Sequence, residues 1–236
     1  MNAARQLMNA ESVVFFHAHP DDETLSGGAL LAALAAAGRR VAVVTATRGE
    51  QGGVVSGVDV GSDLVAHRER ERSAALAALG VTVDAWLGGE RRYTDSGMRW
   101  IRPGVAGPAA QAAPDCLSGA PVAQAAADLV DLLRRFDAQA LVSYDAVGGY
   151  HHPDHVACHR IARAAAQAAG VPRFELLSPE VVPVDGAQWL DHPEQRDRLL
   201  AALHCYPSQF RVVADEIVHV GGQHQSIDTG VWLFRT

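Results

Sequence analysis

Two short segments of the chain carry the side chains that are best suited to chemistry. Residues 19–23 read His-Pro-Asp-Asp-Glu and residues 152–155 read His-Pro-Asp-His. In each segment, two side chains three positions apart can face one point, and three such imidazole or carboxylate ligands with a position left for water make a catalytic zinc site. Either segment alone is a weak signal, because acidic residues are also favoured at helix starts. Together they predict a metal-dependent hydrolytic site.

Zinc is the metal that we expect, because it serves hydrolysis without redox chemistry; imidazoles with carboxylates also suit Fe²⁺ or Mn²⁺. A dinucleotide is a poor fit for the same turn. Gly27 and Gly28 lack the G-x-G-x-x-G spacing, and a bank of carboxylates would repel a pyrophosphate.

The elements that must hold these segments can be predicted from hydrophobic periodicity. Residues 13–16 and 140–144 have the length and apolar content of buried strands, and each runs into one of the two segments. Alternating strand and helix patterns predict an α/β fold, namely a Rossmann-like, doubly wound, mostly parallel sheet with five or six parallel strands and the active site at the carboxyl ends of the strands. The expected strands are residues 13–16, 41–46, 85–87, 140–144, 174–177 and 214–220, with 231–234 as an edge strand or packed tail, and the expected helices are residues 25–37, 63–79, 122–136, 153–169 and 193–203.

Helix boundaries and one long loop complete this prediction. Asp63 suits the N-cap of its helix, Gly80 and Gly170 suit helix ends, and Pro153 suits a first turn. Residues 99–121 are rich in Gly, Pro and Ala without a sustained period, so we expect a surface loop that acts as a flap over the site.

Composition limits the classes of protein. We expect residues 1–236 to form one domain, with a core of about 12–180 and a C-terminal substrate-side extension at 181–236. The net charge of −7 and the lack of a long Arg run argue against a nucleic-acid partner. No apolar run is long enough to span a bilayer and no signal peptide is visible, so a cytoplasmic protein is expected, with a homo-oligomer left open. All 20 basic residues are Arg, which excludes lysine Schiff-base chemistry.

The two segments also resemble the signature of a known family, the PIG-L/LmbE-type zinc-dependent N-acetylglucosaminyl deacetylases. That signature pairs an A-H-P-D-D-E turn with a distal H-P-D-H, found here at residues 18–23 and 152–155. The likeness covers about residues 12–170 and looks closest to the mycothiol-pathway branch. Its other matches are Thr47-Arg48-Gly49-Glu50, Arg68 with Glu71, Leu87-Gly88-Gly89, Asp95-Ser96-Gly97-Met98, and Tyr144-Asp145 leading into Gly148-Gly149-Tyr150.

The resemblance implies a deacetylation of an amino sugar and gives individual residues roles. Asp21 would be the general base on zinc-bound water. His152 would donate to the developing oxyanion, held in its tautomer by a carboxylate such as Asp154, and Tyr150 resembles a mobile tyrosine that closes on the acyl group. The implied metal ligands are His19, Asp22 and His155. The implied substrate-binding residues are Arg48, Arg68 and Asp95.

Other interpretations stay open at this point. His17 is expected to pack rather than to bind metal, Glu23 to support the turn, and residues 67–72 can be read as an ordinary ion-paired helix face. A two-metal phosphoesterase and a non-catalytic sugar-binding protein are the alternative functions. The chain departs from the mycothiol branch at Gly52-Gly53 and in its short C-terminal part, so deacetylase chemistry is better supported than a mycothiol-type substrate.

Overall fold

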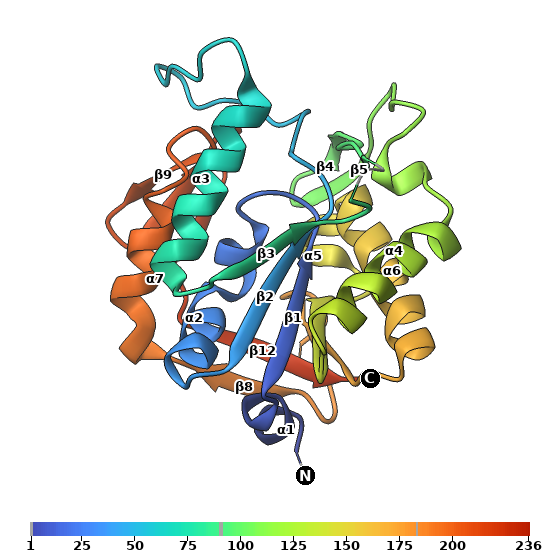
Figure 1. Ribbon diagram of the computed structural model, residues 1–236. Helices are drawn as coiled ribbons and strands as arrows, with labels where there is room; N and C mark the ends of the chain where they lie inside the picture. The colour runs from blue at the N-terminus through green and yellow to red at the C-terminus, as the bar shows by residue number, and fades with distance from the viewer. Residues whose placement is uncertain (1, 90–91, 183) are drawn as a thin grey trace.

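The computed structural model describes residues 2–89, 92–182 and 184–236. Seven strands of this part form one central sheet: β1 (Ser12–His17), β2 (Arg40–Thr45), β3 (Val83–Trp86), β6 (Ala140–Tyr144), β7 (Arg173–Leu176), β8 (Gln188–Asp191) and β12 (Gly230–Arg235). Their order is β3-β2-β1-β6-β7-β12-β8, and the first five run parallel to one another (Figure 1). β12 is antiparallel to both β7 and β8. The predicted α/β class with a mostly parallel sheet is therefore confirmed.

The two chemical segments meet because β1 and β6 are neighbours in the sheet. Val14 of β1 pairs with Leu141 of β6 in parallel register, so both strands end at the same edge. Every residue of both strands is buried, as expected for central parallel strands that are covered on both faces. Side chains 135 positions apart in sequence, such as His19 and Asp154, are consequently in contact.

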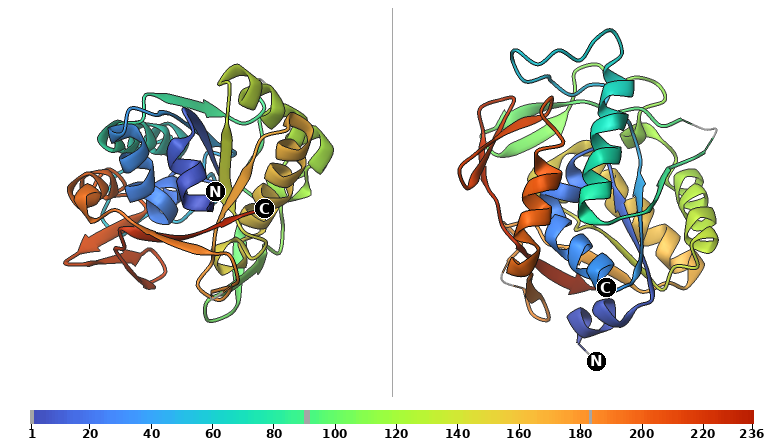
Figure 2. Two further views of the ribbon diagram at one scale, coloured as in Figure 1. Left: turned by 90° about the horizontal axis from the view of Figure 1, so that it is seen from below. Right: turned by 60° about the vertical axis from the view of Figure 1, so that its left-hand side comes forward.

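Helices cover both faces of the sheet (Figures 1 and 2). Because side chains alternate along a strand, Phe15 packs in the core under the first group of helices, whereas Phe16 packs in the core under the second. The first group is α2 (Asp22–Ala36), α3 (Leu64–Leu79) and α7 (Arg196–Leu203), and the second is α4 (Val122–Arg135) and α6 (Pro153–Ala169).

No helix among the described residues is both long and apolar enough to cross a membrane.

The predicted helix ends are confirmed where a cap residue signals them. The Asp63 side chain accepts a hydrogen bond from the Ala66 N–H at 3.0 Å and so begins α3. Gly80 and Gly170 are left-handed at the ends of α3 and α6, and Pro153 is the first residue of α6.

Helix α2 begins earlier than the expected residue 25. The carbonyl of Asp21 accepts the Leu25 N–H at 2.9 Å, so Asp22 and Glu23 already lie in the first turn. Gly27 has non-helical angles inside α2, which explains why periodicity alone placed the start too late.

The segment 99–121 is not the irregular loop that we expected. It contains most of a hairpin of β4 (Met98–Arg102) and β5 (Val105–Pro108), turned at Gly104 with φ 76°, and a 3₁₀ turn, η1 (Leu117–Gly119). Strands of four or five residues with a glycine turn between them are too short to show a clear alternation.

The strands after residue 181 differ most from the predicted ones. β8 was not predicted, and the strand expected at 214–220 is β10 (Glu216–His219), which pairs with β9 (Phe210–Val213) and β11 (His224–Ser226) in a separate small sheet. Ala214, with φ 53°, forms the turn before β10. β12 is neither an edge strand nor a packed tail, since it lies between β7 and β8. The pairing of β12 with β7 and β8 joins segments far apart in sequence and leaves no local signal.

Candidate active site

The turn between β1 and α2 places the first set of functional side chains at the edge of the sheet. Asp21 has φ 109°, a conformation that costs free energy for a residue with a Cβ. The Glu23 carboxylate accepts the Asp21 N–H at 3.2 Å and helps to hold this turn. The strained backbone turns Asp21 and Asp22 in different directions, so the two carboxylates have separate surroundings.

Three side chains present converging donor atoms. His19 Nδ1 lies 3.1 Å from one carboxylate oxygen of Asp22, and His155 Nε2 lies 3.3 Å from the other. Two ligand atoms on one tetrahedral zinc ion are about 3.3 Å apart when each bond is about 2.0–2.1 Å. Both distances are close to this value. Among the described residues, two groups of donor atoms lie close enough together for one ion: His19 with His152 and His155, and His19 with Asp95 and Asp154. Asp22 lies beside the first group, in contact with His19 and His155.

The outer nitrogens of the two imidazoles are already committed. His19 Nε2 lies 3.2 Å from a carboxylate oxygen of Asp154 and 3.5 Å from one of Asp95. His155 Nδ1 lies 3.1 Å from the Gly148 carbonyl, to which it can donate. A carboxylate or carbonyl on the far nitrogen is the usual support of a metal-binding histidine, since it fixes the tautomer.

The remaining nitrogen of His155 gives an independent test of this fit. His155 Nε2 is buried and makes no hydrogen bond within the described structure, although it is close to Asp22. A buried polar atom without a hydrogen bond costs free energy unless a further partner satisfies it. A metal ion is such a partner, so the residues present fit the metal that the sequence implied.

His152 completes a cluster of three imidazoles. Its ring centroid lies 4.7 Å from that of His19 and 4.8 Å from that of His155, and the donor atoms of the three rings can reach one ion. Burial first, and then the neighbouring imidazoles, hold the pKa of His152 well below its usual value. His152 is therefore neutral near pH 7.

The contact that fixes the His152 tautomer differs from the one expected. We expected the Asp154 carboxylate to hold this ring, but His152 Nδ1 instead accepts the Asp154 backbone N–H at 3.2 Å. The carboxylate itself accepts both the N–H and the hydroxyl of Ser96 and contacts His19. Because Nδ1 is an acceptor in the neutral ring, the proton of His152 is on Nε2.

Asp21 has an environment unlike that of Asp22. Removal from bulk water, followed by the charge of Asp22, raises the pKa of the Asp21 carboxyl well above its usual value, and the Arg68 guanidinium opposes this rise. Asp21 lines the cavity, whereas Asp22 is the carboxylate that contacts both His19 and His155. Its carboxylate is thus available to exchange a proton.

A cavity of about 910 Å³ opens over this cluster, and Arg68 and Asp95 line it. The Arg68 guanidinium donates to the carbonyls of Gly49 and Gly53, and a Cβ at Gly52 would overlap it. A side chain larger than glycine at Gly52 would therefore displace Arg68, which gives the Gly52-Gly53 departure a physical role.

Arg48 lies outside that cavity. Its guanidinium carbon is 4.3 Å from the centroid of the Trp86 ring, and its Nε is 3.4 Å from Glu69. The preference of a guanidinium for an aromatic face explains this direction. Arg48 therefore does not point into the cavity, contrary to the substrate contact that we expected for it.

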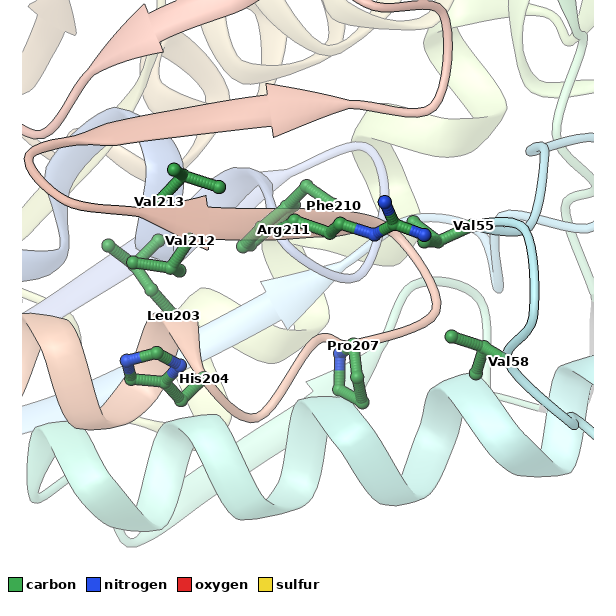
Figure 3. Close-up of a pocket in the computed structure, with 9 residues that line it drawn as sticks. All are labelled: Val55, Val58, Leu203, His204, Pro207, Phe210, Arg211, Val212 and Val213. Carbon is green, nitrogen blue, oxygen red and sulfur yellow. The ribbon is translucent and has the colours of Figure 1, made fainter.

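A second, smaller pocket of about 340 Å³ lies between residues 55–58, the end of α7 and β9 (Figure 3). Its lining is mainly Val, Leu, Pro and Phe, and its Arg211 donates to the Ser56 carbonyl at 2.9 Å. The pocket holds none of the predicted site residues, most of which line the larger cavity.

Comparison with known proteins identifies the family of this chain. The family model described as GlcNAc-PI de-N-acetylase (PIG-L) matches residues 14–166. The chain belongs to this family. A curated relative, the 1D-myo-inositol 2-acetamido-2-deoxy-alpha-D-glucopyranoside deacetylase of Nocardioides sp. (strain JS614), is 42% identical over 170 residues, which are 70% of this chain and 56% of the relative. The chain thus spans little more than half the length of that relative.

Solved structures support the family's fold over most of the chain. The zinc-inhibited form of teicoplanin deacetylase Orf2 is 22% identical with a TM-score of 0.65, covering 95% of this chain and 98% of that one. The N,N'-diacetylchitobiose deacetylase of Pyrococcus horikoshii is 18% identical with a TM-score of 0.64, covering 87% and 73%. At these identities the likeness shows the fold alone.

The PIG-L match ends at residue 166, yet later residues contact Glu23 of the turn after β1 and Glu71 of α3. The Tyr206 hydroxyl donates to Glu23 at 2.5 Å, and the Ser208 N–H and hydroxyl donate to Glu71 at 2.9 and 2.6 Å. We did not identify Tyr206 from the sequence. An isolated tyrosine between a helix and a strand gives no signal of its partner. The burial of Glu23, which makes a donor necessary, is known only from the structure.

We expect Tyr206→Phe to lower both stability and turnover. Glu23 would lose a donor from a buried carboxylate, a loss of about 1.5–3 kcal/mol, and would hold the Asp21 N–H less firmly. Thermal unfolding should report the first effect, and a severalfold lower kcat with unchanged KM the second. Tyr93→Phe is the control, because Tyr93 donates to Asp128 at 2.5 Å away from this turn. Equal kcat in the two variants would contradict the role of Tyr206.

Proposed function

We propose that this chain is a zinc-dependent amidase that removes the acetyl group from the 2-amino group of an N-acetylglucosamine-containing small molecule or glycoside. The observation that carries the proposal is the separation of roles at one cavity. His19, Asp22 and His155 present neighbouring donor atoms, and the Gly148 carbonyl fixes the tautomer of His155, while Asp21 lines the same cavity beside them. Membership of the PIG-L family supports the reaction, and relatives named as deacetylases of amino sugars support the substrate class.

We propose that His19 through Nδ1, Asp22 through its carboxylate and His155 through Nε2 hold the metal. When bound, a divalent metal supplies Lewis acidity toward a water molecule and an acyl oxygen. Zinc suits this ligand set, with Fe²⁺ as the alternative.

The other residues of the cavity have proton and positioning roles in this proposal. Asp21 takes a proton from the attacking water molecule while the water oxygen bonds to the acyl carbon. It then returns this proton to the amide nitrogen as the C–N bond breaks, which gives acetate and a free amine. The raised pKa of Asp21 suits a group that must both accept and release a proton near neutral pH. His152 donates its Nε2–H to the developing oxyanion. Asp154 acts through His19, which its carboxylate contacts, and not through His152.

Tyr150 and the substrate contacts follow from the lining of the cavity. Tyr150 stands between Gly149 at φ 73° and His151 at φ 65°, with its ring centroid 5.8 Å from that of His152. We propose that it closes on the acyl group, and that Arg68 and Asp95 bind hydroxyls of the sugar. Arg48 is not retained in this set.

We further propose that residues 1–236 act as a single deacetylase domain of the Rossmann-like, doubly wound type. The support is the parallel strand order with helices on both faces, and β12, which joins the C-terminal residues to the same sheet. We do not assign the full substrate of the longer relatives to this chain. Inositol is therefore one of several aglycones to be tested.

A two-metal phosphoesterase is less well supported. The second group of metal-capable donors, His19, Asp95 and Asp154, shares His19 with the first group. The Asp154 carboxylate already accepts two hydrogen bonds from Ser96. We therefore propose one metal ion per chain.

An amine-release assay tests the proposed function. Zinc-loaded protein is incubated with a panel of N-acetylglucosamine compounds that includes the free sugar, methyl and inositol glycosides and nucleotide sugars, and the new amine is quantified. We expect release from at least one member and its loss after chelation. Absence of release from every member would overturn the proposal, and turnover of a phosphate ester with two ions bound per chain would favour the phosphoesterase.

A further inference from the structure

The cavity extends well beyond the metal cluster, and its outer part is aromatic. Three large aromatic side chains of the described residues are strongly exposed: Trp189 at 49%, Trp100 at 41% and Tyr150 at 37%. All three line this one cavity. Exposed apolar side chains that gather at one place usually mark a binding surface.

The aromatic side chains lead outward from the reacting centre along the edge of the sheet. Tyr150 contacts the metal cluster, with ring centroids 5.4 Å apart for Tyr150 and His155, and it pairs with Trp100 at 5.5 Å. Trp232 and Trp189, on the adjacent strands β12 and β8, form a second pair at 5.5 Å.

Strand pairing gives the approximate length of this path. The Leu177 N–H, just after β7, donates to the Trp232 carbonyl at 2.9 Å, and Trp232 lies directly opposite Trp189 in the antiparallel pair. From β6, where the cluster begins, to β8 there are three strand spacings, or about 14 Å. Trp189 is therefore too far from the cluster to contact the reacting acetamide, but it is within reach of a group attached to the sugar.

Trp189 is held as a flat platform. Its ring lies so close to the Gly230 backbone that a Cβ at Gly230 would overlap it. Trp189 is 49% exposed and lines the cavity. Glycine at position 230 thus allows the indole to lie against the backbone while about half of the side chain stays accessible.

The surroundings of the platform favour an apolar occupant over a second sugar. Leu176, Leu177, Val182 and Val231 line the cavity near the tryptophans and offer no side-chain hydrogen bonds. Several polar side chains that line the cavity are already paired, namely His219 with Gln225, His224 with Glu216, and Thr229 with Asp191. Gln209, Gln223, Ser226 and Asp228 also line it. A polyol would leave hydroxyls unsatisfied against the aliphatic wall, which is costly.

We propose that this outer part of the cavity is an aglycone subsite, and that the preferred substrate carries an aromatic aglycone that stacks on Trp189. The inference rests on the proposed deacetylase function and adds the chemical class of the group on the far side of the sugar. Binding energy gained there lowers KM or raises kcat without a change in the chemistry at the acetamide.

Matched substrates test the subsite directly. Amine release is measured for the methyl, phenyl, inositol and N-acetylglucosaminyl glycosides of N-acetylglucosamine with one anomeric configuration. We expect kcat/KM for the phenyl glycoside to exceed that for the methyl glycoside about tenfold or more. Equal values for the two, or a higher value for inositol or the second sugar, would overturn the subsite while leaving the deacetylase function in place. No release from any glycoside would instead contradict the function itself.

Variants connect the preference to one side chain. In Trp189→Ala the advantage of the phenyl glycoside should fall to near unity, with the rate for the methyl glycoside unchanged; Trp189→Phe, which keeps a flat ring and the contact with Trp232, should keep most of it. Val122→Ala is the control, since Val122 is exposed but does not line the cavity. Circular dichroism verifies that both Trp189 variants are folded. If the rates for the phenyl and methyl glycosides then fall by the same factor in Trp189→Phe and in Trp189→Ala, a role of Trp189 in aglycone binding is contradicted.

Discussion

Asp21→Asn is expected to lower kcat by about a thousandfold or more and to leave the metal in place. The amide has nearly the size of the carboxylate but cannot accept the proton of the attacking water, and loss of a general base typically costs about 10²–10⁴ in rate. In the proposed ligand set the carboxylate comes from Asp22, which contacts His19 and His155, so metal content should stay near that of the unaltered protein. Elemental analysis and amine-release kinetics on the same preparation measure both quantities.

The backbone at Asp21 makes asparagine the appropriate replacement. Asn tolerates positive φ better than most residues, and the Glu23 contact to the Asp21 N–H does not involve the side chain that is changed. Retained activity in the Asn variant, or loss of the metal together with activity, would refute the assignment of Asp21 as the base.

His155→Ala is expected to remove the metal and, with it, the activity. The substitution deletes one of three converging donors and leaves Asp22 without the partner that its second oxygen contacts at 3.3 Å. Structural support is lost as well, because the His155 ring stacks on Tyr144 at 4.3 Å and contacts the Gly148 carbonyl. We expect less than a tenth of the normal metal content after dialysis, and metal-dependent thermal stabilisation should disappear.

His151→Asn is the matched control for this loss. His151 lies in the same segment, but its imidazole contacts Glu180 at 3.0 Å, away from the metal-capable donors, and Asn can adopt its positive φ. Normal metal content is expected in this variant. Equal metal content in the His155→Ala and His151→Asn proteins would show that the ligand set is different from the one proposed.

The central features of the candidate site could be predicted from sequence because they are local. In the segment 19–23, a histidine and a carboxylate three positions apart at a turn needed only a strand before and a helix after to share a face. The caps at Asp63, Gly80 and Pro153 were predictable for the same reason, since the stabilising contact lies within a few residues of the signal.

The contacts made by charged and aromatic side chains near the site were less predictable. Arg48 belongs to a recognisable motif, yet Trp86 on β3 attracts its guanidinium away from the cavity. Asp154 supports His152 through its backbone and uses its carboxylate for Ser96 and His19, a choice that depends on where β4 and η1 bring Ser96. Residue type alone restricts the partners but does not select one.

The sequence by itself determined the α/β class, the edge of the sheet where chemistry occurs, and the two segments that meet there. Tertiary structure alone decided what surrounds them: Tyr206 on Glu23 across 183 positions, β12 between β7 and β8, and the Trp189–Trp232 pair in the outer cavity. The physical reason is the range of the interactions. Periodicity, caps and turns act within a few residues, whereas strand order and side-chain partners depend on segments that come together only when the whole chain packs.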